Sequence, residues 1–525
     1  MAAPDLIVCG ARVHGVDGAE AVAVSGERIS AVGSRAGMLA LRGTATRVVD
    51  VPRGLVCAGF HDAHAHLFPL AEARREVDLH GKSLAEIRDA VASVAAKRQP
   101  GRWIIGRGYD PELFRAAAAE GTTARALLDP VSPDHAVLLR SHDYHAVALN
   151  SRGLALTGFL PAPADEEGGA VDRDGAGEPT GVLRENSALS ATLQCNDLTP
   201  DELTRGAIEA CFEMARAGVT AIHDMSGSRR HDLLLQLDDA RCLPLDVYAT
   251  FSPTDAGAFA DPRDAFGNQD ARRLRVVGMK AFLDGALGSR TALLLAPYEG
   301  EACHCGIEVL PRETARECVA AAAAAGVPSY LHAIGDAAVR NALDVLTDVR
   351  GPGGARLRHR VEHAQMIHDA DLPRFAASGI VASVQPVHMA LDAPLVHRHW
   401  GARSHEAFPL RRLLDSGACV AFGSDTPIES FDVIEGIACA VRRRGRDGTV
   451  LHAEEALTVA EAIDAYTSGA AWAVGAERTS GAVRTGAFAS LTVLSEDVVA
   501  HPEALSDAHV AATIVRGSVL HGSAA

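Results

Sequence analysis

The middle of the chain alternates short apolar segments with stretches of helical character, and this pattern constrains the fold more than any other feature. The apolar segments are Val219–His223, Val276–Phe282, Ser329–His332, Arg360–His363, Ile380–Val384 and Cys419–Phe422. Helical stretches such as residues 199–218 and 311–327 lie before or between them. This alternation is typical of parallel strands joined by crossover helices. Six or more such units over about 250 residues predict an α/β fold of the TIM-like (β/α)8 barrel type.

Both ends of the chain show a different pattern, in which short apolar runs are separated by glycine turns. The clearest runs are residues 5–15, 21–33, 486–497 and 509–522. Runs of this kind predict strands joined by hairpins. We therefore expect residues 1–57 and 475–525 to pair into one small β-sandwich domain. Residues 58–474 are expected to form the barrel.

Residues 71–196 fit the strand-helix repeat poorly. They include a polar segment rich in Gly and Asp, ADEEGGAVDRDGAGEPTG, at residues 164–181. We interpret this region as an insertion after the first barrel strand. Because the catalytic face of such a barrel is built from the loops that follow its strands, the insertion is expected to cover the mouth or to shape a pocket there.

Charge and composition exclude several classes of partner. The 525 residues include 50 basic and 67 acidic side chains, a net charge of −17, which argues against binding of a phosphate backbone. The N-terminal residues lack the basic and apolar regions of a signal peptide, and no run approaches the ~18 apolar residues of a membrane helix. Ten scattered cysteines indicate free thiols. We expect a cytoplasmic protein with no nucleic acid and no membrane as partner.

Polar side chains end the predicted barrel strands. The six residues are His64, His66, Lys280, His332, His363 and Asp425. Because the carboxyl ends of barrel strands meet at one face, we expect these side chains to converge on one site. Imidazole and carboxylate groups are ligands for Zn, Fe, Ni or Mn. The sequence therefore predicts a metal site at the barrel mouth.

The segment GFHDAHAH, residues 59–66, holds three histidines and one aspartate. Side chains of a strand alternate between its two faces, so His64 and His66 share a face with Asp62. We expect those two histidines to point to the barrel mouth and Asp62 to anchor the strand. His61 is expected to face the surrounding helices and to be structural.

These residues, together with further segments along nearly the whole chain, resemble the amidohydrolase superfamily. Within that superfamily, the sequence resembles most the branch of metal-dependent hydrolases that includes N-substituted formamide deformylase. This branch is the YtcJ-like group, or amidohydrolase family 3. Any one of these segments is weak evidence for the family, whereas all of them together in this order are specific to it. The segments include GRWIIGRGYD (101–110), NSRGLALTG (150–158), GVTAIHD (218–224), MKAFLDGALGSRTALLLAPY (279–298), LHAIGDAAV (331–339), RVEHAQ (360–365), SVQPVH (383–388) and FGSDTPIES (422–430).

The resemblance implies two positions for divalent metal ions. His64, His66 and Asp425 would bind the more buried ion, and His332 and His363 would bind the second. Zinc is the expected metal, because histidine and carboxylate ligands with an open coordination position suit it. Whether one ion or two are bound is left open.

The resemblance also implies chemical roles for Lys280 and Asp425. A lysine ammonium has no acceptor atom, so Lys280 would bind metal only as a carbamate formed with CO2. The nucleophile would be a metal-activated hydroxide, because a bound metal lowers the pKa of water from ~15.7 to about 7. Asp425 would take the proton of this nucleophile and pass it to the leaving amine.

A further set of residues is predicted to bind the substrate. These residues are Tyr109, His145, His223, Asp284, Arg290 and His388. His223 has an alternative role in supporting a metal ligand. Arg290 can clamp a substrate carboxylate or pair with a neighbouring acid.

Together these features predict a hydrolase that acts on carbon–nitrogen bonds other than peptide bonds, in an amide or N-formyl compound. One alternative is that the same site hydrolyses an ester or a cyclic amide. The other is a metal-binding regulatory protein without turnover. The expected partner is a small-molecule substrate, and a homodimer is left open.

Overall fold

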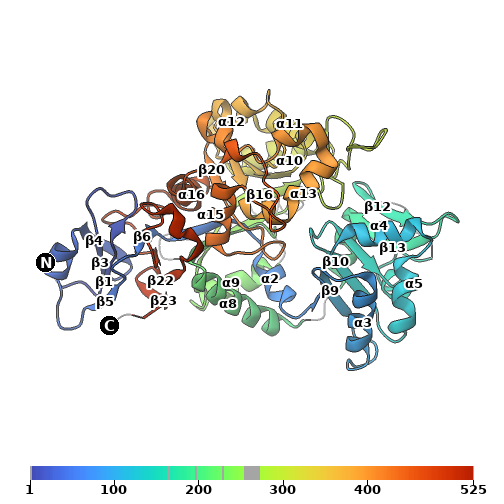
Figure 1. Cartoon of the computed structure of the whole chain (residues 1–525), viewed down its shortest axis with the longest axis horizontal. Coiled ribbons are helices and arrows are strands. Elements are labelled where there is room, and N and C mark those ends of the chain that lie inside the picture. Colours follow the sequence, from blue (N-terminus) through green and yellow to red (C-terminus); the bar gives the residue numbers. More distant parts are fainter. Residues whose placement is uncertain (1–2, 162–165, 196–197, 228–229, 254–271, 524–525) are drawn as a thin grey trace.

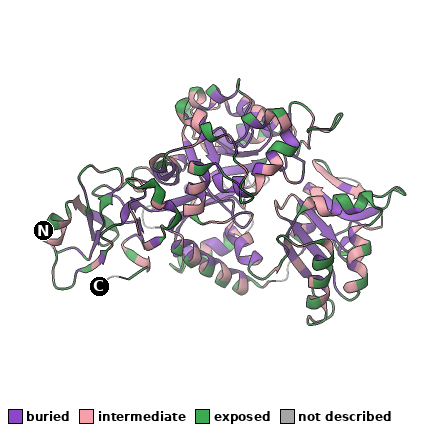
Figure 2. Ribbon diagram, in the orientation of Figure 1, coloured by how far each residue is buried: buried purple, intermediate pink, exposed green. Residues whose placement is uncertain are grey.

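The computed structural model describes residues 3–161, 166–195, 198–227, 230–253 and 272–523. Figure 1 shows a central barrel, a β domain at one end that holds both termini, and a separate sheet with helices at the other end. The purple ribbons of Figure 2 show that buried residues concentrate in the strands, whereas exposed residues line the outer faces of the helices. None of the helices in the described part of the chain has the length and apolar character needed to span a bilayer.

Eight parallel strands form the central barrel, and their order in the sheet is their order in the chain. An isolated parallel bridge between Ala65 and Thr426 joins the first strand to the segment after the last. The predicted barrel is therefore confirmed, although the strand at residues 246–251 was not predicted. The strands are β7 (Phe60–Ala65), β14 (Val219–Asp224), β15 (Asp246–Phe251), β16 (Leu274–Phe282), β17 (Ser329–Ala333), β18 (Arg360–His363), β19 (Val381–Val384) and β20 (Val420–Phe422).

Helices follow the barrel strands and pack their apolar faces against them. The helix α8 begins with a capping box, in which Thr199 accepts from the backbone N–H of Glu202 and the Glu202 carboxylate accepts from that of Thr199. A single large core lies between the strands and this outer layer. The helices include α8 (Pro200–Arg216), α9 (His231–Asp239), α10 (Arg312–Ala324), α11 (Asp336–Leu346), α12 (Leu372–Ser378), α14 (Leu410–Asp415) and α15 (Val433–Arg442).

The β domain consists of two sheets, one of which contains strands from both ends of the chain. The order of the first sheet is β4-β3-β1-β5, with bounds Arg28–Gly33, Ala21–Ser25, Leu6–Cys9 and Arg47–Asp50. The order of the second is β2-β6-β21-β22-β23, with bounds Arg12–Val13, Leu55–Ala58, Leu491–Leu494, Val510–Val515 and Ser518–His521. Side chains of both sheets share one apolar core, which makes this domain the expected β-sandwich. Its boundaries at residues 57 and 475 stay predictions.

The insertion between β7 and β14 has a mixed six-stranded sheet of its own, with the order β12-β13-β11-β10-β9-β8. Helices pack on this sheet around two apolar clusters. The strands are β8 (Val77–Asp78), β9 (Ile104–Tyr109), β10 (Val137–Ser141), β11 (Ala146–Leu149), β12 (Gly169–Arg173) and β13 (Pro179–Glu185). The helices include α3 (Leu84–Ala95), α4 (Pro111–Ala119), α5 (Ala124–Leu128), α6 (Ser151–Leu156) and α7 (Asn186–Gln194).

The expectation that His61 faces the surrounding helices is wrong. Its Nδ1 lies 3.3 Å from Nε2 of His223, and its ring stacks on Tyr248 inside the barrel. His64 also points inward, so the strict alternation of faces fails between these two residues. The pairing of β7 with β14 shifts register there, with three residues of β7 opposite two of β14. Such a bulge inserts one residue and re-aims the side chains that follow it.

We predict that Gly59→Ala destabilises the barrel. A Cβ atom at residue 59 would overlap the side chain of Thr220 on the neighbouring strand. Overpacking of a buried site costs about 1–3 kcal/mol, so the midpoint of thermal or urea unfolding should fall. Gly33→Ala is the control, because its nearest neighbour would be the flexible tip of Met38 at 3.4 Å. Equal midpoints for both variants would contradict the prediction.

Candidate metal centre

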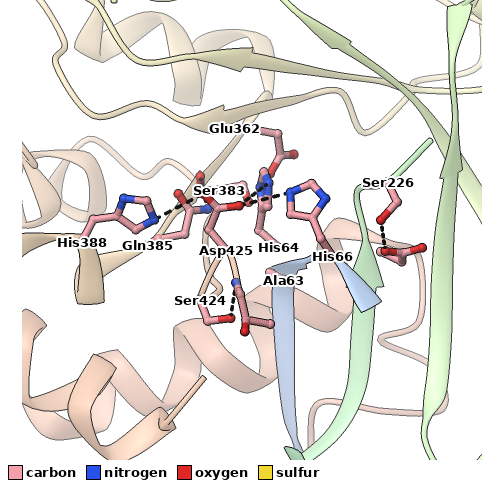
Figure 3. Close-up of polar contacts among 12 residues, drawn as sticks. Ala63, His64, His66, Ser226, Glu362, Ser383, Gln385, His388, Ser424 and Asp425 are labelled. Carbon is pink, nitrogen blue, oxygen red and sulfur yellow. Dashed lines mark hydrogen bonds and ion pairs between the residues drawn. The ribbon is translucent and has the colours of Figure 1, made fainter. Parts of the chain in front are cut away.

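His64, His66 and Asp425 surround one point at the barrel mouth (Figure 3). Oδ1 of Asp425 lies 3.4 Å from Nε2 of His64 and 3.2 Å from Nε2 of His66. These distances are at or beyond the upper end for an N–H···O hydrogen bond. They match the separation of about 3.3 Å between two ligand atoms of a tetrahedral zinc ion at its usual bond lengths. The three residues therefore fit a divalent cation.

Asp62 connects this group to the loop after the last strand. Its carboxylate accepts hydrogen bonds from the backbone N–H of Ser424 at 2.9 Å, from Oγ of Ser424 at 2.5 Å and from the backbone N–H of His64 at 3.2 Å. The backbone N–H of Asp425 in turn donates to the carbonyl of His64 at 2.6 Å. Asp62 therefore anchors the strand, as the sequence suggested, and fixes His64 relative to Asp425.

Glu362 on β18 contacts the ring of His64 at Nδ1, the nitrogen that faces away from Asp425. Its Oε2 lies 2.7 Å from Nδ1 of His64, and Arg360 donates to the same oxygen at 3.0 Å. Burial alone raises the pKa of Glu362, but the charge of Arg360 and the His64 hydrogen bond hold it below its usual range. An ionised Glu362 accepts the Nδ1 proton, which leaves the Nε2 lone pair of His64 free for a metal.

Lys280 lies fully inside the barrel, with 2% of its surface exposed. Its Nζ has no hydrogen-bond partner among the described residues and lies 4.7 Å from the centre of the Phe282 ring. Burial lowers the pKa of Lys280 to about 8, although Glu362 and Asp425 partly oppose this shift. The neutral amine is therefore a larger fraction of Lys280 near neutral pH than it is of an exposed lysine.

His332 and His363 complete the cluster of imidazoles. The centre of the His363 ring lies 4.5 Å from that of His332 and 4.7 Å from that of His64. Nε2 of His332 donates to the carbonyl of Gly285 at 3.1 Å, which leaves a lone pair on its Nδ1. Burial lowers the pKa of both rings well below its ordinary value, so both are neutral, as metal ligands must be.

Two members of the predicted substrate set lie beside these residues. His145, from the insertion, has its ring centre 5.2 Å from that of His332, and its Nδ1 lies 2.7 Å from Glu185. Burial alone lowers the pKa of His145, but the charge of Glu185 outweighs this and raises the pKa to about 9. His388 follows β19, and its Nε2 lies 3.4 Å from Oδ2 of Asp425.

The other four members of that set have different partners. Asp284 accepts hydrogen bonds from three backbone N–H groups and shapes the loop after β16. Arg290 pairs with Glu301, which is the alternative that the sequence left open. Tyr109 is buried against Phe114 in the core of the insertion.

His223 is fully buried, between His61 and Arg360. Its Nδ1 lies 3.0 Å from the guanidinium of Arg360, which in turn holds Glu362. This position suits the alternative role of His223, which is to support a residue that binds metal. Sequence reasoning missed Arg360 and Glu362, although both lie in the segment RVEH with the two-residue spacing of a single strand face.

Known proteins resemble this chain over almost its full length. The model of a family described as "Amidohydrolase family" matches residues 47–521. The chain is 29% identical to the putative amidohydrolase YtcJ of Bacillus subtilis over 499 residues, which cover 91% of this chain and 90% of that protein. It is also 29% identical to an N-substituted formamide deformylase of Arthrobacter pascens over 517 residues, 94% of each chain.

A solved structure supports the same relationship. An uncharacterized metal-dependent hydrolase from Pyrococcus horikoshii is 26% identical and superposes with a TM-score of 0.75, over 94% of this chain and 98% of that chain. The resemblance stated from the sequence is thus confirmed. The individual ligand and substrate roles stay predictions.

We predict that Glu362→Gln weakens metal binding. Glutamine keeps the size of the side chain but lacks the charge that holds the His64 proton on Nδ1. Loss of such an outer partner typically costs about 10-fold to 100-fold in metal affinity, which a competition titration with a chelator measures. Glu406→Gln is the control, because Glu406 is also buried, with 6% of its surface exposed, but lies outside the cluster. An unchanged affinity for Glu362→Gln would refute the role of this residue.

Proposed function

We propose a function from one premise: this chain belongs to the amidohydrolase family. The proposal is that it hydrolyses a C–N bond, other than a peptide bond, in an amide or N-formyl compound. The observation that carries it is the group His64, His66 and Asp425, whose atoms are spaced as ligands of one cation. Similarity to the N-substituted formamide deformylase over 94% of both chains supports the N-formyl substrate class.

The proposed metal is zinc, in one or two ions, because imidazole and carboxylate ligands with an open position suit it. When bound, it supplies a Lewis acid for the substrate carbonyl and lowers the pKa of water from ~15.7 to about 7. The chain's own part is to present neutral imidazoles at fixed positions. His332 and His363 are held neutral by burial, and Glu362 fixes the tautomer of His64.

Asp425 is the proposed carrier of the proton. Burial raises the pKa of its carboxyl, but His64 and the other neighbouring imidazoles outweigh burial and hold the pKa well below its usual value. The ionised carboxylate accepts the proton that the attacking water loses as its oxygen bonds to the carbonyl carbon. It then donates this proton to the leaving nitrogen as the C–N bond breaks, so one water is consumed for each bond cleaved.

Lys280 is the proposed site of carboxylation. A neutral amine is the form that adds CO2, and the lowered pKa of Lys280 provides it near neutral pH. Its Nζ is buried inside the barrel and has no hydrogen-bond partner within the described part of the chain. As a carbamate, the side chain would gain two acceptor oxygens that the ammonium lacks.

His145 and Phe282 are the proposed contacts of the substrate. Protonated His145, held by Glu185, can donate a hydrogen bond to the oxygen that becomes negative during attack. Phe282 leaves 37% of its surface exposed and lies 5.2 Å from the His332 ring, measured between ring centres. An apolar group next to the scissile bond would cover this exposed ring.

We predict that the metal-loaded protein hydrolyses N-formyl amines and releases formate and amine in equal amounts. The experiment compares N-formyl amines, N-acyl amides, lactams and esters, with and without prior removal of metal by a chelator. Turnover should disappear with the metal and return when zinc is added back. A preference for esters or lactams would favour the alternative substrates. Bound metal without turnover of any compound would favour a metal-binding regulatory protein.

We predict that Lys280→Ala loses metal and activity together. Reconstitution of the wild-type chain should also depend on bicarbonate, because the carbamate forms from CO2. Metal content is measured by elemental analysis and activity on the best substrate of the panel. Lys82→Ala provides the control, since Lys82 lies in the insertion, outside the barrel interior. Full activity of Lys280→Ala would refute the carbamate.

A further inference from the structure

The two oxygens of the Asp425 carboxylate face different imidazoles (Figure 3). Oδ1 lies between His64 and His66, at 3.4 and 3.2 Å from their Nε2 atoms. Oδ2 lies 3.4 Å from Nε2 of His388, on the opposite side of the carboxylate. Asp425 therefore has one ligand-like oxygen for each of two groups of histidines.

The second group consists of His363, His388 and Asp425. Their ligand atoms all lie within 4.8 Å of one another. Nε2 of His388 and Nδ1 of His363 are both buried, and neither has a hydrogen-bond partner in the part of the chain that the structure describes. A buried polar atom without a partner costs free energy, and a bound cation would satisfy both nitrogens at once.

The distance between His388 and Asp425 is compatible with two ligands of one cation. At 3.4 Å it is longer than a normal N–H···O bond, whereas the bonds from His64 to Glu362 and from His145 to Glu185 are 2.7 Å long. It equals the distance between His64 and the other oxygen of Asp425. Both match the separation of about 3.3 Å between two ligands of a tetrahedral zinc ion.

The far side of the His388 ring also has the surroundings of a metal ligand. Its Nδ1 faces Oδ2 of Asp392 at 4.0 Å, and Gln365 donates to that same oxygen at 2.7 Å. Metal-binding histidines commonly present their second nitrogen to a carboxylate, which orients the ring. Two carboxylates, Asp392 and Asp425, thus flank one imidazole.

We propose that His388 is a metal ligand and that it forms, with His363 and Oδ2 of Asp425, a second cation position. Asp425 then bridges the two ions through its two oxygens, in addition to any bridge that Lys280 provides. The inference rests on the proposed function only in that the first ion is the one held by His64, His66 and Asp425. It gives His388, from the segment after the seventh barrel strand, a role in place of the substrate contact expected from the sequence.

The test is a metal titration of the full chain with Co²⁺, followed by absorption and electron paramagnetic resonance spectroscopy. The wild-type chain should bind two ions, whose spins are coupled through the shared carboxylate. His388→Ala should bind one ion and lose the coupling, with the first dissociation constant little changed. His142→Ala is the matched control, because His142 also lies at the mouth beside a carboxylate, 3.2 Å from Glu429, but belongs to neither group.

If His388→Ala does not fold, as judged by circular dichroism, His388→Gln replaces it, since glutamine fills a similar volume with a much weaker ligand. Two coupled ions in the folded variant would overturn the proposal. A wild-type chain that binds one ion and hydrolyses amides would overturn the second position and leave the proposed function intact. A wild-type chain that binds no ion would overturn both.

Discussion

The contact between the first barrel strand and the segment after the last one positions everything else in the site. The Ala65–Thr426 bridge, the bonds of Asp62 to Ser424 and the 2.6 Å bond from the Asp425 N–H to the His64 carbonyl close the cylinder there. Residues separated by more than 350 positions thereby meet, and the carboxylate of Asp425 reaches the imidazoles of β7. The backbone of Asp425 has a positive φ of 62°, which the surrounding hydrogen bonds must stabilise.

A chain of buried polar groups continues from this contact through the barrel interior. Glu362 holds His64 and is held by Arg360, which contacts His223 at 3.0 Å. His223 contacts His61 at 3.3 Å, and His61 reaches Oγ of Ser480 at 2.6 Å. Burial of a polar group costs free energy unless the group is paired. These continuous contacts offset that cost and make the interior rigid. The geometry of the candidate metal ligands therefore depends on residues well below the mouth.

The residues of the candidate site could be grouped from the ends of the predicted strands for a simple physical reason. Parallel strands of a barrel present their carboxyl ends at one face, so His64, His66, His363 and Asp425 could be grouped without a structure. The same reasoning could not place Arg290, because its partner Glu301 is chosen by the path of a loop. It missed Glu362, whose position behind His64 depends on which strands face each other across the barrel. Its prediction for His61 failed at a bulge, which depends on pairing with β14.

The sequence by itself determined the architecture and the chemistry available to it. Periodic apolar segments specify strands and helices, and the side chains at the strand ends specify a site of imidazoles, an amine and a carboxylate. Only the tertiary structure decided which atoms meet. The register shift in β7 allows both His61 and His64 to point inward, and barrel closure gave Asp425 histidines on both of its oxygens. Such contacts join residues that are distant in the chain, and their distances depend on packing rather than on local sequence pattern.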